Sequence, residues 1–419
     1  MPASSTRSPL ATPDQQYAES LALRLVELPR IRAAREQARA VLLADPIART
    51  PEGWLGLDRA LDQWVLALAM RVVNADPFRP RIVWGVYNPP RIWFGHVYPG
   101  AAVAIDNPDN CNREIPIDGD STYEIRGRFG NPAMQFMIEI VTDFEQYSGL
   151  GRTMSALTSQ SIVTEADGSF ILTVDSQPAN GRSNHLQSEP GTNWMFMRDS
   201  ASDWTKEWTT LSVVRLSGPP APHVRSEDAI ADDIVRSMPV WIRFWNGFKD
   251  DFLGYPEPNR LVGPIGRPGG WGYLFGGRFE IAPDEAVVVT TTDGAANYTG
   301  FQISDPWTLS PDPVYRLASL NKSQIRPNPD GTITYVIAAN DPGVHNWIDT
   351  VGLLQGWMLL RWQGVPSATD PATLVLSVKT SKLSDLAETL PQGVPMATLA
   401  SRSAQIADRI SGYARRYIE

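Results

Sequence analysis

The sequence contains few of the residues that form disulfides and metal sites. Cys111 is the single cysteine, so no internal disulfide can form and no Cys-x-x-Cys pair is present for zinc. The four histidines include no pair spaced to bind one metal ion from a helix: His96, His185, His223 and His345. We therefore expect no metal ion and no other cofactor.

Long apolar segments and clusters of basic residues are also absent. No stretch approaches the roughly 18 consecutive apolar residues of a membrane-spanning helix, and the N-terminus lacks the apolar stretch of a signal peptide. The net charge is −9 and no run of Lys and Arg occurs, which argues against nucleic acid and membranes as partners. We expect a soluble, cytoplasmic protein.

Hydrophobic and aromatic residues, by contrast, are plentiful, with 42% of the former and 14 tryptophans. A single hydrophobic core stops growing at about 250–300 residues, so a chain of 419 residues predicts two cores. After residue 80, short β-type segments alternate with Pro, Gly, Asn and Asp, a texture typical of sandwiches and jelly rolls. The sequence predicts a mainly β fold of two related sandwich or jelly-roll-like units with helical additions.

Helices are predicted at the N-terminus, in the middle and at the C-terminus. Thr50 and Ser226 are expected N-caps, Pro239 is expected to end the central helix, and the glycine-rich residues 263–277 are expected to form a long loop. The predicted organisation is an N-terminal helical segment (1–80), a first β-unit (81–222), a helical and glycine-rich connector (223–270), a second β-unit (271–380) and a C-terminal helical segment (381–419).

Two parts of the chain resemble each other. Residues 157–169 (LTSQSIVTEADGS) and 320–332 (LNKSQIRPNPDGT) share Leu, Ile, Asp and Gly at a constant spacing of 163 residues, and each Asp-Gly turn precedes a β-type run. We interpret this as an internal duplication. We therefore expect residues 157–176 and 320–339 to have the same strand direction and turn type.

A second pair of segments, 189–194 (EPGTNW) and 341–347 (DPGVHNW), also matches. The Pro-Gly pair suits a type II turn and the tryptophan can pack onto the core, so a structural role is the more common outcome. However, His345 is an extra residue of the second segment and Asp349 follows it. This asymmetry favours a functional role for the second copy.

Residues 105–120 (IDNPDNCNREIPIDGD) and 123–127 (YEIRG), together with 341–352 (DPGVHNWIDTVG) and Arg361-Trp362, resemble the bacterial DUF1214 family, often found with the related DUF1254 domain. The resemblance covers about residues 105–127 and 279–364. It implies β-sandwich, jelly-roll-like domains and no established activity. Cys111 stands where the family has Tyr, so we expect this cysteine to be dispensable.

The leading hypothesis is an enzyme that acts on a small apolar, aromatic or sugar-like molecule in a cleft between the β-units. Its chemistry is metal-independent acid–base chemistry such as hydrolysis, elimination or isomerisation. His345 is the expected proton-transfer group because imidazole titrates near neutral pH; Asp341 or Asp349 orients it, and Arg361 neutralises developing negative charge. The expected substrate contacts are Trp347, Asn346, Trp93, Tyr98 and Trp271.

Two alternatives belong to other functional classes. One is a non-catalytic protein that binds a carbohydrate or an apolar metabolite, which needs the aromatic residues alone. The other is a structural subunit whose helices mediate homo-oligomerisation. Convergence of His345, Asp349 and Arg361 on one pocket would favour the enzyme.

Four aspartates fall close together in residues 106–120: Asp106, Asp109, Asp118 and Asp120. Their spacing does not fit an EF-hand loop. The sequence leaves open whether they bind calcium or are solvated turn residues.

Overall fold

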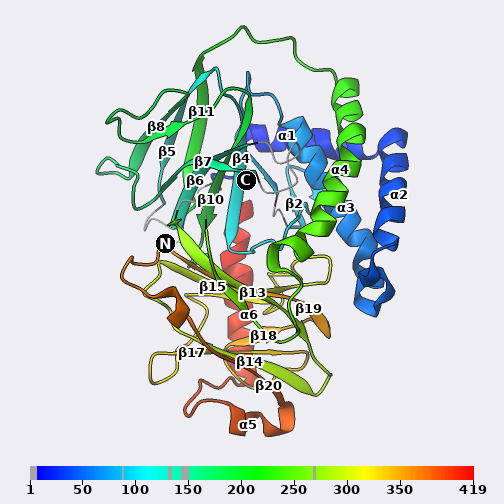
Figure 1. Cartoon of the computed structure of the whole chain (residues 1–419), viewed down its shortest axis with the longest axis vertical. Coiled ribbons are helices and arrows are strands. Elements are labelled where there is room, and N and C mark those ends of the chain that lie inside the picture. Colours follow the sequence, from blue (N-terminus) through cyan, green and yellow to red (C-terminus); the bar gives the residue numbers. More distant parts are fainter. Residues whose placement is uncertain (1–6, 87–88, 131–134, 143–150, 268–269) are drawn as a thin grey trace.

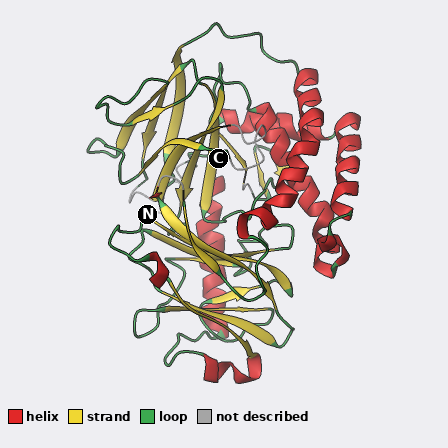
Figure 2. Ribbon diagram, in the orientation of Figure 1, coloured by secondary structure: helices red, strands yellow, loops and turns green. Residues whose placement is uncertain are grey.

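The computed structural model of the chain describes residues 7–86, 89–130, 135–142, 151–267 and 270–419. These residues form a mainly β protein with helices at the N-terminus, in the middle and at the C-terminus, as the sequence predicted (Figures 1 and 2). None of the helices in these ranges is both long and apolar enough to cross a membrane.

The first β-unit consists of two packed sheets. The five-stranded sheet has the order β1 (Val83–Val86), β4 (Asn110–Asp118), β10 (Thr192–Ser200), β6 (Gln135–Thr142) and β7 (Thr153–Thr158). The four-stranded sheet has the order β11 (Thr210–Ser217), β5 (Thr122–Arg128), β8 (Ser169–Asp175) and β9 (His185–Gln187). Alternate residues of both sheets, such as Ile115, Ile138 and Leu172, bury their side chains between them.

The second β-unit repeats this arrangement. Its five-stranded sheet has the order β12 (Val262–Gly266), β13 (Gly272–Glu280), β19 (Gln355–Gln363), β15 (Tyr298–Ser304) and β16 (Ser319–Asn321). Its four-stranded sheet has the order β18 (Trp347–Asp349), β17 (Ile333–Ala338), β14 (Glu285–Thr291) and β20 (Val375–Lys382). In both units the short strand β9 or β18 is parallel to its neighbour, whereas the other paired strands of these sheets are antiparallel.

The two Asp-Gly turns have the same local structure. Gly168 and Gly331 have φ angles of 79° and 84°, a region that glycine enters readily because it has no Cβ. Each turn aspartate accepts a hydrogen bond from the backbone N–H two residues later, at 3.0 Å for Asp167 and 2.9 Å for Asp330. The strands after the turns, β8 and β17, also agree in direction, because each is antiparallel to one neighbour and parallel to the short strand beside it. The expected match between residues 157–176 and 320–339 in turn structure and strand direction is therefore present in the described structure.

The second proposed match is wrong. Trp194 lies in β10, whose counterpart by strand order is β19, whereas Trp347 lies in β18, the counterpart of β9. The ladder registers equate Trp347 with His185, because these residues pair with equivalent positions of β17 and β8. The same spacing of 163 residues equates Trp194 with Trp357.

Four long helices form a layer beside the first unit: α1 (Pro13–Val26), α2 (Pro29–Leu43), α3 (Pro51–Val73) and α4 (Glu227–Leu253) (Figure 1). Thr50 and Ser226 cap α3 and α4 as predicted, each accepting a backbone N–H of the first turn. The prediction that Pro239 ends the central helix is wrong, because α4 continues to Leu253. The buried aromatic residues after the proline outweigh the roughly 3 kcal/mol that an interior proline costs.

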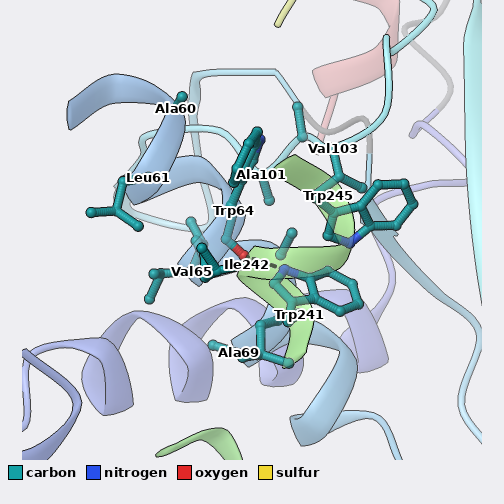
Figure 3. Close-up of a cluster of buried hydrophobic side chains, with 14 of the residues drawn as sticks. Ala60, Leu61, Trp64, Val65, Ala69, Ala101, Val103, Trp241, Ile242 and Trp245 are labelled. Atoms are coloured by element: carbon teal, nitrogen blue, oxygen red, sulfur yellow. Dashed lines mark hydrogen bonds between the residues drawn. The ribbon is translucent and has the colours of Figure 1, made fainter. Parts of the chain in front are cut away.

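The aromatic residues of α4 pack against α3. Trp241 donates its indole N–H to the backbone oxygen of Trp64 at 2.9 Å, and Trp245 lies next to it with 5.6 Å between the ring centroids (Figure 3). Val103, from the segment before β4, belongs to the same hydrophobic cluster. The helical layer therefore packs onto the first unit through a continuous core, and α4 joins α1–α3 instead of acting as a separate connector.

The prediction that the glycine-rich residues 263–277 form one long loop is wrong. Most of β12 and the start of β13 lie within this range. At Gly277 a Cβ atom would lie 1.9 Å from the carbonyl oxygen of Arg260. Glycine is needed here because another backbone segment approaches the strand closely.

The C-terminal segment connects the two units. After the short helix α5 (Leu386–Thr389), helix α6 (Leu399–Ala414) runs behind both sandwiches (Figure 1). Arg402 binds Asp341 of the second unit, and Arg416 lies 4.6 Å from the ring centroid of Trp208 of the first. The described structure also contains a hairpin of β2 (Arg91–Trp93) and β3 (His96–Tyr98), and 3-10 helices at Pro46–Arg49, Pro371–Thr373, Leu383–Asp385 and Arg415–Tyr417.

Candidate functional site

The main candidate site is a cavity of about 340 Å³ between the two β-units. Its lining residues come from the outer faces of the two five-stranded sheets, from the segment before β4 and from the second half of α4. Figure 1 shows how these elements are arranged. Hydrophobic and aromatic side chains make up much of its wall: Val103, Val141, Phe196, Trp245, Phe248, Ile265, Trp271, Leu274 and Leu359. A cavity of this size can enclose a small organic molecule.

Two arginines at equivalent positions face this cavity from the central strands. Arg198 of β10 donates to the carboxylate of Glu139 on the neighbouring strand β6. Arg361 of β19 donates to the side-chain oxygen of Gln302 on β15, and also to the backbone oxygen of Ile105 at 3.0 Å. Glu139 and Gln302 occupy equivalent positions in the two sheets. The second unit therefore has an amide where the first has a carboxylate.

Asn112 of β4 is the least satisfied polar residue of the cavity wall. Its side chain is 3% exposed, and neither its amide nitrogen nor its amide oxygen has a hydrogen-bond partner in the described structure. A buried amide without partners costs free energy, so such groups are rare. Asn112 is the ladder partner of Arg198, and Leu274 is the ladder partner of Arg361, so Asn112 and Leu274 occupy equivalent positions in the two units. One unit therefore has an amide without hydrogen-bond partners where the other has a hydrocarbon side chain.

Trp271 forms part of the aromatic wall. It is 6% exposed, and its indole N–H has no acceptor in the described part of the chain. The guanidinium carbons of Arg267 and Arg198 lie 5.0 Å and 5.7 Å from its ring centroid, within the range of cation–π attraction. Strand β10 and helix α4 supply other rings of the wall, among them Trp245 of α4 (Figure 3).

Among the described residues, two carboxylates line the cavity, and both have partners. Glu114 of β4 lies 3.5 Å from a guanidinium nitrogen of Arg71. Glu139 binds Arg198 and accepts a hydrogen bond of 2.9 Å from the Thr153 hydroxyl. Among the described residues that line the cavity there is no histidine or cysteine. The arrangement can hold a small molecule, and Glu114 and Glu139 are the described groups in its wall that could exchange a proton with it.

Of the predicted site residues, Arg361 and Trp271 line the cavity. His345, Asp341 and Asp349 do not, and the structure does not bring them together with Arg361. Asp349 binds Arg316 at 2.7 Å. His345, Asp341 and Asp349 therefore do not form one site with Arg361.

His345 lies beneath α6 and is 5% exposed. Its backbone N–H donates to Pro395 at 2.7 Å, its ring Nε2 lies 3.1 Å from the Gln405 amide, and its backbone oxygen accepts from Arg402 at 3.2 Å. Arg402 also binds Asp341 through two nitrogens, at 2.8 Å and 2.9 Å. These contacts attach the C-terminal helix to the second unit.

The other predicted contact residues also make structural contacts. Asn346 is fully buried and bonds three backbone groups, and Trp347 donates its indole N–H to the backbone of Ala338 at 2.9 Å. Trp93 and Tyr98 surround the guanidinium of Arg91, whose carbon lies 4.3 Å from each ring centroid. None of these residues is among those that line the cavity.

Burial lowers the pKa of His345 below its ordinary value of 6.5, and the charges of Arg326 and Arg402 add to this effect. The unfolded chain then binds a proton more readily than the folded chain, so stability is full above pH 6.5 and is lost as the pH falls below it. We expect wild-type protein to lose more stability than His345→Gln between about pH 7.5 and about pH 5.5 in urea unfolding. Equal losses in the two proteins would show that His345 does not contribute.

The cysteine and the aspartate-rich segment show no catalytic arrangement. Cys111 is fully buried, and burial raises its thiol pKa to about 12. Asp109 is 2% exposed and accepts hydrogen bonds from Trp204, Tyr298 and Asn321. In the described ranges no three His, Cys, Asp or Glu side chains gather as a metal-binding group.

The sequence analysis missed Asn112, Arg198 and Glu139. The spacing of 163 residues continues through Arg198 and Arg361, and following it past the Asp-Gly turns would have found this pair. No sequence signal marks Asn112, because its burial depends on the contact between the units.

No family model and no curated protein matches this chain. Among solved structures, an uncharacterised protein from Burkholderia cenocepacia is similar, with 22% identity, a TM-score of 0.70 and coverage of 88% of this chain and 99% of that one. A protein from Vibrio parahaemolyticus has 9% identity and a TM-score of 0.43, and covers 66% of this chain and 90% of its own. The first similarity shows that the fold is shared.

Proposed function

We propose that this protein binds a small, largely apolar organic molecule in the cavity between its β-units. The observation that carries the proposal is the cavity itself, which combines aromatic walls with a buried amide at Asn112 that has no hydrogen-bond partner in the described structure. Ligand pockets typically have this composition, a mostly apolar lining with a few fixed polar groups. A protein without a ligand for this site would gain stability by filling the space and removing the amide.

We also propose that the two units arose by duplication and that their outer sheet faces then diverged. The repeated strand order and the paired positions of Arg198 and Arg361 support this. Membership of the DUF1214 family remains part of the proposal and rests on the sequence motifs. Acid–base catalysis is a second candidate function, favoured by the presence of Glu114 and Glu139 in the same cavity.

The test is a thermal-shift screen of a metabolite library against wild-type protein and Leu359→Trp. A ligand raises the unfolding midpoint by mass action, whereas the larger side chain occupies the cavity. We expect hits that stabilise wild-type protein and fail with Leu359→Trp. Leu376→Trp is the matched control, because Leu376 lies on β20 and is 51% exposed. Hits that stabilise Leu359→Trp as much as Leu376→Trp and wild-type protein would place binding elsewhere and contradict the proposal.

A further inference from the structure

The two walls of the cavity differ in polarity although they come from equivalent strands. On the first unit, β4 and β6 contribute Asn112, Glu114 and Glu139. At the corresponding places of the second unit, the ladder registers put Leu274, Gly276 and Gln302. A ligand that fills this cavity therefore meets a polar wall on one side and a largely hydrocarbon wall on the other.

The Asn112 side chain can offer a ligand both a hydrogen-bond donor and a hydrogen-bond acceptor. A carboxamide has an N–H₂ donor beside a carbonyl acceptor, and both atoms lack partners in the described structure. An exchange of the two atoms would not change this, because both are open. A ligand that offers only acceptors, such as an ether or a ketone, would leave the asparagine oxygen unsatisfied. A ligand edge with an acceptor next to a donor satisfies both.

The charges beside Asn112 favour a neutral group. Arg198, its ladder partner, is bound to Glu139, and Glu114 lies two residues further along β4 with Arg71 beside it. Because each of these glutamates is paired with an arginine, the wall beside Asn112 is balanced in charge, and a neutral group suits it better than an ion. The hydrocarbon wall, with Leu274, Leu359 and Trp271, suits a flat ring system.

We infer that the ligand is a neutral, planar molecule with an amide-type edge, a donor beside an acceptor as in a lactam or an aromatic carboxamide, and that Asn112 recognises this edge. The inference rests on the proposed function, because it names the ligand class of the same cavity. Trp271 and Leu359 contact the ring body, and the asparagine sets specificity.

The test uses four bicyclic probes of similar size: 2-quinolinone, which has the amide edge, quinoline, which has an acceptor alone, naphthalene, and the anion 2-naphthoate. Dissociation constants are measured by ligand-observed NMR for wild-type protein, Asn112→Leu and Asn112→Asp. Asn112→Leu reproduces the side chain of the equivalent Leu274, and Asn112→Asp keeps the shape but removes the donor.

We expect 2-quinolinone to bind wild-type protein about tenfold more tightly than naphthalene, and Asn112→Leu to remove this difference while naphthalene binding stays unchanged. Asn112→Asp should also weaken 2-quinolinone binding. Equal binding of 2-quinolinone and naphthalene, equal weakening of both by Asn112→Leu, or tightest binding of 2-naphthoate would overturn the inference and leave the cavity as a binding site. If no probe binds and the screen yields no hit sensitive to Leu359→Trp, the proposed function fails as well.

Discussion

Replacing Arg409 with methionine should lower the free energy of unfolding by about 3–5 kcal/mol. Arg409 of α6 is 2% exposed and donates to the backbone oxygens of Pro313 and Ser319, at 2.6–3.0 Å, and to the Gln324 side chain at 2.9 Å. Its guanidinium carbon also lies 4.6 Å from the ring centroid of Trp204 in the first unit. The substitution leaves these acceptors buried without a donor, and buried unsatisfied groups are costly.

Burial lowers the pKa of Arg409 to about 10, so the side chain remains charged at neutral pH. The measurement is urea unfolding followed by circular dichroism. Arg415→Met is the control, because Arg415 is exposed and donates one hydrogen bond, to Thr205; a surface change should stay within about 0.5 kcal/mol. Equal unfolding midpoints for the two variants would mean that α6 does not hold the units together.

Two asparagine-to-leucine substitutions should change stability in opposite directions. Asn346→Leu should lower the free energy of unfolding by about 3 kcal/mol. Its amide accepts from the backbone N–H of Arg326 at 2.8 Å and donates to the oxygens of Arg326 and Thr334 at 2.8 Å and 3.0 Å. Asn112→Leu should raise stability by about 1 kcal/mol, because it removes a buried amide that lacks partners.

The comparison is well matched because both residues are buried asparagines and the introduced side chain is the same. Unfolding in urea at a single pH measures both. A loss of stability in Asn112→Leu as large as in Asn346→Leu would show that the Asn112 amide has a structural role. The predicted gain would instead mean that the wild-type protein retains a destabilising group at its cavity, as binding sites commonly do.

Local sequence signals predicted the elements that depend on local physics. The caps Thr50 and Ser226 marked the starts of α3 and α4, and the Asp-Gly pairs marked turns of the same local structure in both units. The end of α4 could not be predicted in this way, because Pro239 is tolerated only where a neighbouring helix buries the following aromatic residues. Tertiary contact outweighs the local signal there.

The candidate site was predicted less well than the fold. Arg361 and Trp271 do line the cavity, but His345 was selected for its chemistry and packs against α6. A histidine in a loop looks the same in the sequence whether it faces a cavity or a helix. The position of Asn112 depends on how two sheets approach each other, and no local pattern encodes that approach.

The central claim is that the cavity between the β-units binds a small molecule, and NMR of the tryptophan indole N–H groups tests it most directly. With the tightest hit of the thermal-shift screen, the Trp271 resonance, assigned by its loss in Trp271→Phe, should shift, because Trp271 lines the cavity and its indole N–H has no acceptor in the described structure. The Trp93 resonance should stay in place, since that N–H donates to Glu19 at 2.6 Å in a separate cluster. A ligand that shifts Trp93 and leaves Trp271 unchanged would contradict the account.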